Sequence, residues 1–338
     1  MSLPDEVLVD LPEGWSARVP TTSDIPALVG LVAAHQSIAR GWADVDEESV
    51  ASLVTGTGSW MRRQLVVESA THEVVAWASV HDRAAGHTML DLTVAPDLGD
   101  ADALVAVLLG WIESNAADIA RQRGVASTQL DATLYVGDAR QRRWLTAAGY
   151  DRTRTWLHMT RPVDDAGTLP GPRSGVTVRR VAKHEDGMPQ AQDLRVVHQM
   201  LEESFEDHFN SYRESFPEFV QRLQEDPGHR WDHWWIAEID QDGEQVPGGA
   251  LVSSVLSPDE SGAEGSYIDY IGVHRRARGR GVAKSLLHTV IRDAHDRGRN
   301  RIDLEVDGDS PTGADQLYAS MGWTTKYRTE SWHADCST

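Results

Sequence analysis

Cysteine is almost absent from this sequence, and long apolar runs are missing. A single cysteine among 338 residues, Cys336, excludes an internal disulfide. It lies near the end of the chain in a polar tail, where no ordered base is expected, so it is a poor candidate nucleophile. No stretch approaches the roughly 18 uncharged apolar residues of a membrane span, and Met1-Ser-Leu-Pro-Asp-Glu lacks the regions of a signal peptide. We therefore expect a cytoplasmic protein without a membrane partner.

Positive charge is also scarce, because 32 Lys and Arg residues face 52 Asp and Glu residues, a formal charge of -20. Binding phosphate backbones requires an excess of Lys and Arg, so we expect no nucleic-acid partner. The charge is compatible with a cationic amine substrate, although charge of this sign mainly sets solubility. Among the 14 histidines, His208, His229 and His233 lack H-E-x-x-H spacing or cysteine partners, so we expect no metal site.

One segment reverses this charge balance. Residues 275–284 contain five cations and no acid, and they follow the apolar run Tyr267–Val273. Glycines at 279 and 281 allow the backbone to approach a bulky anion, and the N-terminus of a following helix offers unpaired N–H donors. This pattern predicts a turn that binds a phosphate-bearing ligand. The five cations are Arg275, Arg276, Arg278, Arg280 and Lys284.

The spacing within this segment fits neither a nucleotide-hydrolase phosphate loop nor a dinucleotide-binding turn. Its R-x-x-G-x-A pattern, with Arg278, Gly281 and Ala283, resembles the pyrophosphate-binding signature of the GNAT superfamily of acyl-CoA-dependent N-acetyltransferases. A second apolar strand, residues 301–307, and the block 309–323 follow in the order that the family requires. That block is similar to N-x-x-x-A-x-x-x-Y-x-x-x-G-[FW], with Ser310, Ala314, Tyr318, Gly322 and Trp323 in the pattern, although asparagine is commoner at the first position.

The resemblance implies a mixed α/β fold that binds acetyl-CoA where the strand ending at Val273 separates from its neighbour. The pantetheine would pair with the strand end, and main-chain N–H groups of the turn would hold the pyrophosphate. For the arginine side chains two interpretations stay open, namely binding of the CoA 3′-phosphate or balance of nearby carboxylates. The implied cofactor-binding residues are Ile271, Val273, Arg278, Gly279, Arg280, Gly281, Val282, Ala283, Lys284, Ser310 and Ala314.

An internal duplication extends the pattern to the whole chain. Residues 14–19 resemble 175–180, residues 90–94 resemble 268–273, and residues 144–150 match 317–323. The join is rich in Pro and Gly and indicates a linker. The length also favours two domains, and 40% hydrophobic with 25% charged residues is an ordinary globular composition. We predict two tandem GNAT domains with a mixed α+β sheet, residues 1–162 and 175–338, joined by residues 163–174.

The two copies differ where the family's chemistry takes place. The first copy has Asp97, Asp100 and Asp102 where the pyrophosphate would bind, and like charges would repel it. It also has Leu145 at the position of Tyr318. We therefore predict a degenerate first copy that is structural or shapes the substrate site; binding of a different small ligand is the alternative. Tandem chains of this kind resemble mycothiol synthase and related actinobacterial acetyltransferases, a likeness that leaves the substrate open.

Direct acetyl transfer needs a deprotonated amine, a polarised carbonyl and a proton for the departing thiolate. Tyr318 occupies the family's acid position, although a tyrosine there also packs beneath CoA. Strict strand alternation places Tyr267, Asp269 and Ile271 on one face and Tyr270 on the other. Asp269 is then the predicted base, with Glu305 on the neighbouring strand as the alternate and an ion pair with an arginine as the structural explanation of Asp269.

The acceptor amine is expected beside the segment that follows the first helix of the second copy. There Phe205, Asp207, His208 and Phe209 offer aromatic walls and a carboxylate, together with Tyr267, although helix packing explains the phenylalanines equally well. The resemblance thus predicts an acetyl-CoA-dependent N-acetyltransferase that acts on the primary amine of a small molecule. Alternatives are mycothiol-synthase-like acetylation of an amino-sugar thiol and a non-catalytic acyl-CoA sensor. Acceptor identity and oligomeric state, monomer or homodimer, stay open.

Overall fold

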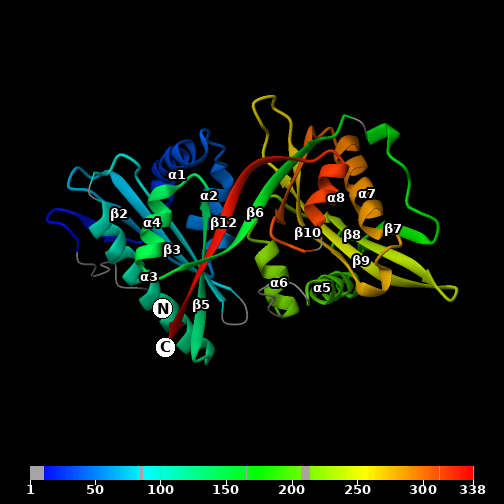
Figure 1. The fold of residues 1–338 in the computed structure, drawn as a ribbon, viewed down its shortest axis with the longest axis horizontal. Helices are drawn as coiled ribbons and strands as arrows, with labels where there is room; N and C mark the ends of the chain where they lie inside the picture. Colours follow the sequence, from blue (N-terminus) through cyan, green and yellow to red (C-terminus); the bar gives the residue numbers. More distant parts are fainter. Residues whose placement is uncertain are drawn as a thin grey trace. The chain divides into compact units, whose positions relative to one another are not determined.

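The computed structural model describes residues 11–83, 87–99, 101–164, 166–206, 214–311 and 313–337 (Figure 1). The chain forms two compact units: unit 1 comprises Met1–Trp156 and Tyr327–Thr338, and unit 2 comprises Leu157–Lys326. Each unit has a mixed sheet with helices on both faces, and the order of elements in one repeats the order in the other. The predicted duplication is therefore visible in the fold.

In unit 1 the strand order is β1-β2-β3-β4-β5-β12. Neighbouring strands are antiparallel except for β4 and β5, which run parallel. The elements are β1 (Ser16–Arg18), α1 (Ile25–Arg40), α2 (Glu47–Val54), β2 (Arg62–Glu68), β3 (Val74–Asp82), β4 (His87–Val94), α3 (Ala101–Arg123), β5 (Ser127–Tyr135), α4 (Ala139–Ala147) and most of β12 (Thr324–Ser337).

In unit 2 the strand order is β6-β11-β10-β9-β8-β7. The parallel pair here is β10 with β11. The elements are the second half of β6 (Asp151–Pro162), β7 (Val176–Arg180), α5 (Ala191–Phe205), α6 (Phe216–Leu223), β8 (His229–Gln241), β9 (Glu244–Leu256), β10 (Gly265–Val273), α7 (Val282–Asp296), β11 (Arg301–Asp307) and α8 (Ala314–Ser320).

The two copies exchange their last strands. Strand β6 follows α4 of the first copy, yet its second half belongs to unit 2, where it neighbours β11. Strand β12 follows α8 of the second copy, yet it pairs with β5 of unit 1 from Thr329 to Ser337. The predicted boundaries at 162 and 175 therefore describe the sequence repeat, whereas the compact units share strands across it.

This exchange also corrects the expectation for the end of the chain. Cys336 lies in β12, paired with Thr128 of β5, and packs against the core of unit 1. Burial raises the pKa of its thiol. The surroundings of Cys336 are therefore ordered, because the edge of β5 binds this strand by main-chain hydrogen bonds.

A buried ion-pair cluster anchors the first strand of unit 1. Arg18 Nη1 and Nη2 donate to the two carboxylate oxygens of Asp24, each at 2.7 Å, and Arg18 Nε donates to Glu68 at 3.0 Å. The hydrogen bond from Arg18 lowers the pKa of Asp24 to about 2. Asp24 is only 6% exposed and stays ionised, because the paired guanidinium offsets the cost of burying the charge.

Unit 2 repeats this cluster with other residues at equivalent positions. Arg179 donates to Asp193 at 2.6 and 3.1 Å and to Glu238 at 2.9 Å. In the strand register, Arg18 lies opposite Val66 and Arg179 lies opposite Ile236. Glu68 and Glu238 each follow that opposite residue by two positions. The duplication therefore extends to side-chain geometry.

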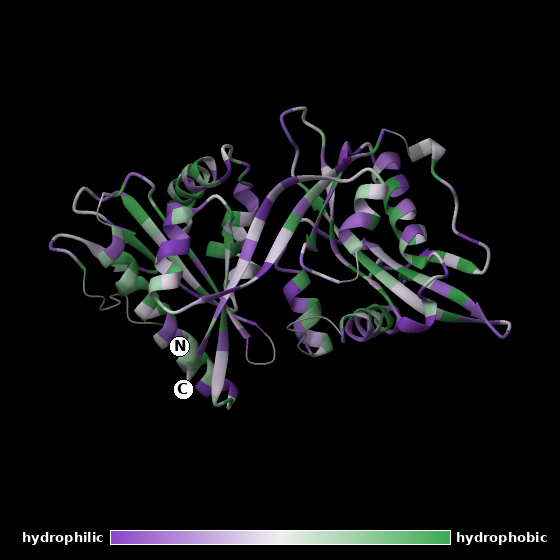
Figure 2. Cartoon of the chain, viewed as in Figure 1, coloured by the Kyte–Doolittle hydropathy of each residue, from purple (hydrophilic) through white to green (hydrophobic). Residues whose placement is uncertain are grey.

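Apolar side chains form one core on each face of each sheet. In unit 2, Ile268, Leu286 and Ile302 contribute to the core beneath α7, and Trp234 and Val252 to the core beneath α5 and α6. Figure 2 shows the mixture of hydrophobic and hydrophilic residues along α7 and the strands of this unit. In unit 1, α3 is long and apolar enough, by length and composition, to cross a membrane, but its inner face packs as a core helix against β3 and β5.

Candidate functional site

The strands β10 and β11 separate within unit 2. Their parallel pairing runs from Gly265 opposite Arg301 to Ile268 opposite Leu304, and it extends no further among the described residues of the two strands. Strand β10 continues to Val273 while its other edge stays paired with β9. The backbone of β10 beyond Ile268 therefore presents unpaired polar groups towards the gap, and a ligand with an amide backbone can pair with them.

A β-bulge lies where the strands separate. The register of β10 against β9 shifts between Ile268 and Tyr270, so Asp269 is the extra residue. Asp269, which accepts a bond from Ser254, lies on the face of the sheet beneath α5 and α6. Tyr270 packs in the core on this same face, whereas Ile271 packs on the opposite face, beneath α7. The predicted sharing of faces was wrong for Tyr270 and Ile271, because a bulge breaks the two-residue alternation of a strand.

Asp269 lies in an environment that resists ionisation. Burial is the main cause that raises the pKa of its carboxyl well above the usual range, and the nearby carboxylate of Asp226 adds to it. Ser254 Oγ donates to Asp269 at 3.2 Å. Arg222, whose charge acts on Asp269, forms a two-pronged ion pair with Glu214 at 2.9 and 2.6 Å instead. An arginine partner is therefore not the role of Asp269, and a strained carboxyl beside a gap is a candidate for proton transfer.

Further acidic residues line the same side of β11. Glu305, the alternate base, lies one position past the last paired residue and is next to His158 of β6, with Nε2 to Oε2 at 2.9 Å. Asp303 lies opposite Tyr267 and pairs with Lys326 at 3.1 Å. Sequence reasoning missed His158, because its strand comes from the other copy and only the strand exchange brings it here.

The glycine-rich turn has the backbone that anion binding requires. Gly279 and Gly281 have φ of 77° and 85°, left-handed values that favour glycine, and α7 begins immediately afterwards at Val282. The first N–H groups of a helix have no partner inside it, and Ser285 is the first residue of α7 whose N–H bonds backward, to Gly281. The turn therefore offers its donors and the positive end of the helix to an anion.

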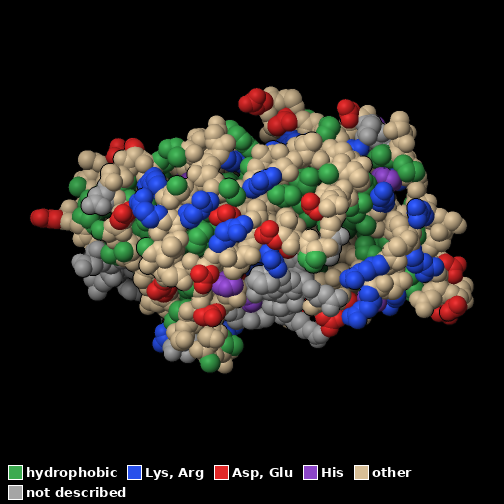
Figure 3. All heavy atoms as spheres, in the orientation of Figure 1, with side chains coloured by type: hydrophobic (Ala, Val, Ile, Leu, Met, Phe, Trp, Pro, Cys, Tyr) green, Lys and Arg blue, Asp and Glu red, His purple; other side chains and the backbone are tan. Residues whose placement is uncertain are grey.

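The five cations of the turn divide into two groups. The side chains of Arg278 and Lys284 form no ion pair or hydrogen bond among the described residues, and both are available to a ligand. The other three bind the protein: Arg275 binds Glu206 at 2.6 Å, Arg276 binds the carbonyl of Pro247 at 2.6 and 3.1 Å, and Arg280 binds the carbonyl of Asp240 at 2.8 Å. Figure 3 shows Lys and Arg side chains gathering over the part of unit 2 that contains α7 and β7–β9.

Arg173 is a further cation at the turn, and no sequence pattern indicated it. A Cβ placed on Gly281 would lie 2.6 Å from Arg173 Cδ, so the arginine stem crosses directly over this glycine. A cation near a helix N-terminus is unfavourable unless an anion joins it. The equivalent position in the first copy is Pro12, since Trp15 donates to Pro12 as Val176 donates to Arg173.

Tyr318 lies in the core beneath the turn. It is 7% exposed, and its ring meets Trp323 edge to face at 5.7 Å. Burial raises the pKa of its phenol to about 12, so the hydroxyl keeps its proton at neutral pH. Ala314 packs against the same core, and the N–H of Ser310 donates to Asp307 at 3.4 Å. Packing and proton donation are both compatible with this position.

Of the predicted acceptor residues, Phe205 is described at the end of α5. Its ring meets Tyr270 edge to face at 6.4 Å, so it packs on the Asp269 side of the sheet. Asp207, His208 and Phe209 lie outside the described residues. Within the part of the chain that the structure describes, no group of three or more His, Cys, Asp or Glu residues is placed to hold a metal.

Unit 1 has the same strand separation without the rest of the site. Strands β4 and β5 pair only from His87 to Leu90, but β4 meets β3 in continuous register from Asp82 to Ala76, without a bulge. Helix α1 closes against the end of β5: His35 lies 2.7 Å from Asp138, and a Cβ on Gly137 would lie 2.3 Å from the carbonyl oxygen of Ala39.

Two of the three acids of the first copy, and the leucine at the position of Tyr318, lie among the described residues. Asp102 accepts from Arg143 and Trp144, each at 2.7 Å, at the start of α3, whereas Asp97 is exposed and Asp100 lies outside the described residues. Leu145 is buried at the position of Tyr318, because Tyr150 donates to Leu145 as Trp323 donates to Tyr318.

Comparison with known proteins finds a family model that matches a segment of unit 2. Residues 197–323 match the model of the Acetyltransferase (GNAT) family. N-acetyltransferase 8B of Rattus norvegicus is 35% identical over 94 residues, 28% of this chain and 40% of that protein, so the chain spans about two-fifths of the length of this curated relative. A GCN5-related N-acetyltransferase from Sphaerobacter thermophilus is 24% identical and has a TM-score of 0.76, with 97% of this chain and 98% of that chain covered.

A second solved structure has the duplicated architecture. It is a tandem GNAT protein from the clavulanic acid biosynthesis pathway, without AcCoA, 15% identical with a TM-score of 0.66, covering 96% of this chain and 99% of that one. At these identities the structural likeness shows the fold. The predicted fold class is confirmed: the chain is a tandem pair of GNAT-fold units.

Proposed function

We propose that unit 2 is an acetyl-CoA-dependent N-acetyltransferase that acetylates a primary amine of a small molecule by direct attack. The observation that carries the proposal is the separation of β10 from β11 after Ile268, next to an anion-binding turn. The gap offers backbone groups for a pantetheine arm, and the turn offers donors for a pyrophosphate. This arrangement matches the pantetheine arm and the adjoining pyrophosphate of acyl-CoA.

The residues of unit 2 would hold the cofactor at three places. The N–H groups of Gly281 to Lys284 would bind the pyrophosphate, with Arg278 and Lys284 as free cations beside it. The exposed edge of β10 as far as Val273 would pair with the pantetheine amides and place the thioester at the bulge. An N–H near Val273 would polarise the acetyl carbonyl, so that negative charge developing on its oxygen is stabilised.

Proton transfer would use groups on both sides of the gap. Asp269, when ionised, accepts the proton of the attacking amine, and its raised pKa makes it a stronger base than an ordinary aspartate. Glu305, beside His158, is the alternate base. Tyr318 keeps its proton at neutral pH and donates it to the departing thiolate. Asp269, Asp303 and Glu305 together favour a cationic acceptor.

Two other functions make different demands on the same residues. Acetylation of an amino-sugar thiol, as in mycothiol-synthase-like enzymes, needs the same base and turn and differs only in the acceptor. A non-catalytic acyl-CoA sensor needs the turn but no base. The bulge at Asp269 favours catalysis, because burying a carboxyl beside the gap reduces stability and serves no purpose in a sensor.

The experiment is a thiol-release assay with the full chain, acetyl-CoA and a panel of primary amines that includes an amino sugar with a free thiol. We expect amine-dependent release that Asp269→Asn reduces strongly. Binding of acetyl-CoA without amine-dependent release across the panel would support the sensor, and failure to bind acetyl-CoA would contradict the proposal.

A further inference from the structure

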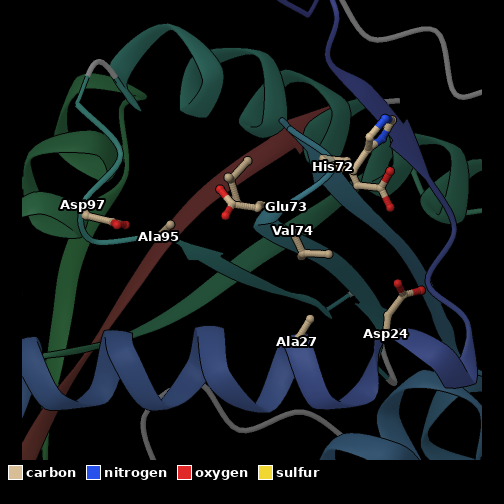
Figure 4. A pocket seen from close by; sticks show the side chains of 9 residues that line it. Asp24, Ala27, His72, Glu73, Val74, Ala95 and Asp97 are labelled. Atoms are coloured by element: carbon tan, nitrogen blue, oxygen red, sulfur yellow. The ribbon is translucent and has the colours of Figure 1, made fainter. Parts of the chain in front are cut away.

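A hollow of about 520 Å³ opens on unit 1, and it is lined by carboxylates (Figure 4). Asp24 and Glu68 lie at one end, where Arg18 binds both, and Glu73 and Asp97 border the remainder. In Figure 4 the carboxylates of Glu73 and Asp97 point towards one another. The methyl groups of Ala27 and Val74 form an apolar floor.

The charge of this hollow is not balanced. Arg18 offsets part of the charge of Asp24 and Glu68. Glu73 accepts a hydrogen bond from Thr71, and neither Glu73 nor Asp97 has a cationic partner in the described part of unit 1. Acids alone do not define a binding site, since such clusters are often only solvated. The other copy of the fold supplies an independent comparison.

The two copies can be aligned residue by residue at this place by their backbone hydrogen bonds. Ala95 donates to Val75 at 2.8 Å in unit 1, and His274 donates to Gly248 at 3.0 Å in unit 2. Asp97 lies two residues after Ala95, and Arg276 lies two residues after His274. Asp97 is therefore the counterpart of Arg276.

The carbonyl that Arg276 binds also has a counterpart. A shift of register on the second strand of each copy places Val74 opposite Glu68 and Pro247 opposite Glu238. In unit 2 the Arg276 guanidinium donates to the Pro247 carbonyl through Nε at 3.1 Å and Nη2 at 2.6 Å. Val74, the counterpart of Pro247, lines the hollow. Unit 2 thus holds a guanidinium where unit 1 has an open space and an acid.

A second cation is missing as well. Arg280 of unit 2 donates to the carbonyl of Asp240 near the end of β8. The loop after β4 of unit 1 is shorter than the loop after β10 of unit 2, because α3 begins six residues after Ala95 whereas α7 begins eight residues after His274. The loop of unit 1 contains no Lys or Arg. His72 and Glu73, in the turn between β2 and β3, border the hollow instead.

We propose that this hollow of unit 1 binds the guanidinium or ammonium group of an alkylguanidine or alkylamine. The ligand's cation takes the place that Arg276 fills in unit 2, between the Val74 backbone and Asp97, and its alkyl chain lies on the floor formed by Ala27. Glu73 accepts hydrogen bonds from the side of the ligand's cation that faces solvent. The site is separate from the acetyl-transfer site, and the inference does not depend on that activity.

The test is calorimetric titration of the full chain with butylguanidine and with butylurea, its neutral isostere, at physiological ionic strength. We expect saturable binding of one butylguanidine that loses about tenfold or more in affinity with butylurea, because charge-assisted hydrogen bonds are lost. Asp97→Asn weakens binding by a similar factor. Asp97→Arg abolishes it, because the new side chain fills the hollow as Arg276 does in unit 2.

Two controls separate this site from its alternatives. Glu13→Gln removes the same charge from an exposed position of unit 1 outside the hollow and leaves the affinity unchanged. Asp269→Asn alters only the site of unit 2 and also leaves it unchanged. Absence of saturable binding, equal losses in Asp97→Asn and Glu13→Gln, or full binding by a folded Asp97→Arg would each overturn the proposal.

Discussion

Substituting Gly281 by aspartate tests the anion-binding turn most directly. The geometry at Gly281 gives two reasons why the substitution lowers the stability of the ligand-free protein. Its φ of 85° costs a non-glycine residue about 1–2 kcal/mol, and the new Cβ would lie 2.6 Å from Arg173 Cδ, the flexible part of a side chain that can move. We therefore expect Gly281→Asp to fold with a stability reduced by about 1–2 kcal/mol.

The effect on CoA is larger than the effect on folding. A carboxylate about 5 Å from a phosphate repels it by about 3 kcal/mol at an effective dielectric constant of about 20, roughly two orders of magnitude in affinity. Displacement of Arg173 adds to this loss. The assay is calorimetric titration with CoA, with thermal unfolding recorded to verify the fold.

Gly298→Asp is the matched control. Gly298 lies just beyond the C-terminal end of α7. It has a φ of 75° and open space where a Cβ would lie. The substitution therefore adds the same charge and similar backbone strain, far from the turn along the helix. Unchanged CoA affinity in a folded Gly281→Asp, or an equal loss in both variants, would show that the turn does not hold the pyrophosphate.

Three further predictions concern unit 2. Tyr318→Phe keeps the ring and should lower turnover on the order of 10² or more while CoA affinity stays near wild type; full turnover in steady-state assays would exclude the acid role. Asp269→Asn should remove the limb of the pH profile on which activity rises with pH through the raised pKa of Asp269, and an unchanged profile would favour Glu305. One acetyl-CoA should bind per chain, and two equivalent sites in calorimetry would contradict a degenerate first copy.

The raised pKa of Asp269 also has a consequence for stability. The folded protein holds this proton more tightly than the unfolded chain, so between the ordinary and the raised pKa the stability falls as pH rises. Asp269→Asn removes the buried charge that forms above that range. The variant should unfold at a higher temperature than wild type near neutral pH, and the difference should shrink on acidification. A lower melting temperature at neutral pH would show that the carboxylate is stabilised by partners.

The sequence was sufficient where the signal is local. The glycines of the 275–284 segment predicted a turn, and both have positive φ in the structure. The apolar runs at 267–273 and 301–307 predicted the two strands beside it, which pair in parallel. The repeat was detectable because short segments such as 14–19 and 175–180 keep the same residue types. These are features that a few neighbouring residues determine.

Features set by distant parts of the chain could not be predicted in this way. The bulge at Asp269 depends on the register of β9, which strand periodicity does not reveal. Arg173 reaches Gly281 from the linker, more than a hundred residues away in sequence. The contact of His158 with Glu305 requires the exchanged strand. Each arises from tertiary packing that overrides the local pattern.

The duplication separates what the fold requires from what the chemistry requires. Both copies keep the arginine with its two carboxylates, Arg18 in unit 1 and Arg179 in unit 2, at matching strand positions and within a few tenths of an ångström in hydrogen-bond length. This cluster joins the first strand, the first helix and the second strand, and removing one member would leave a charge buried without its partner. The turn after the fourth strand differs between the copies: it contains arginines in unit 2, three of which bind other parts of that unit, and aspartates in unit 1. Because the charge of the turn differs in sign between the copies while the arginine cluster does not, the ligand preferred by each unit should follow its turn: an anion at Gly281 in unit 2 and a cation at Asp97 in unit 1.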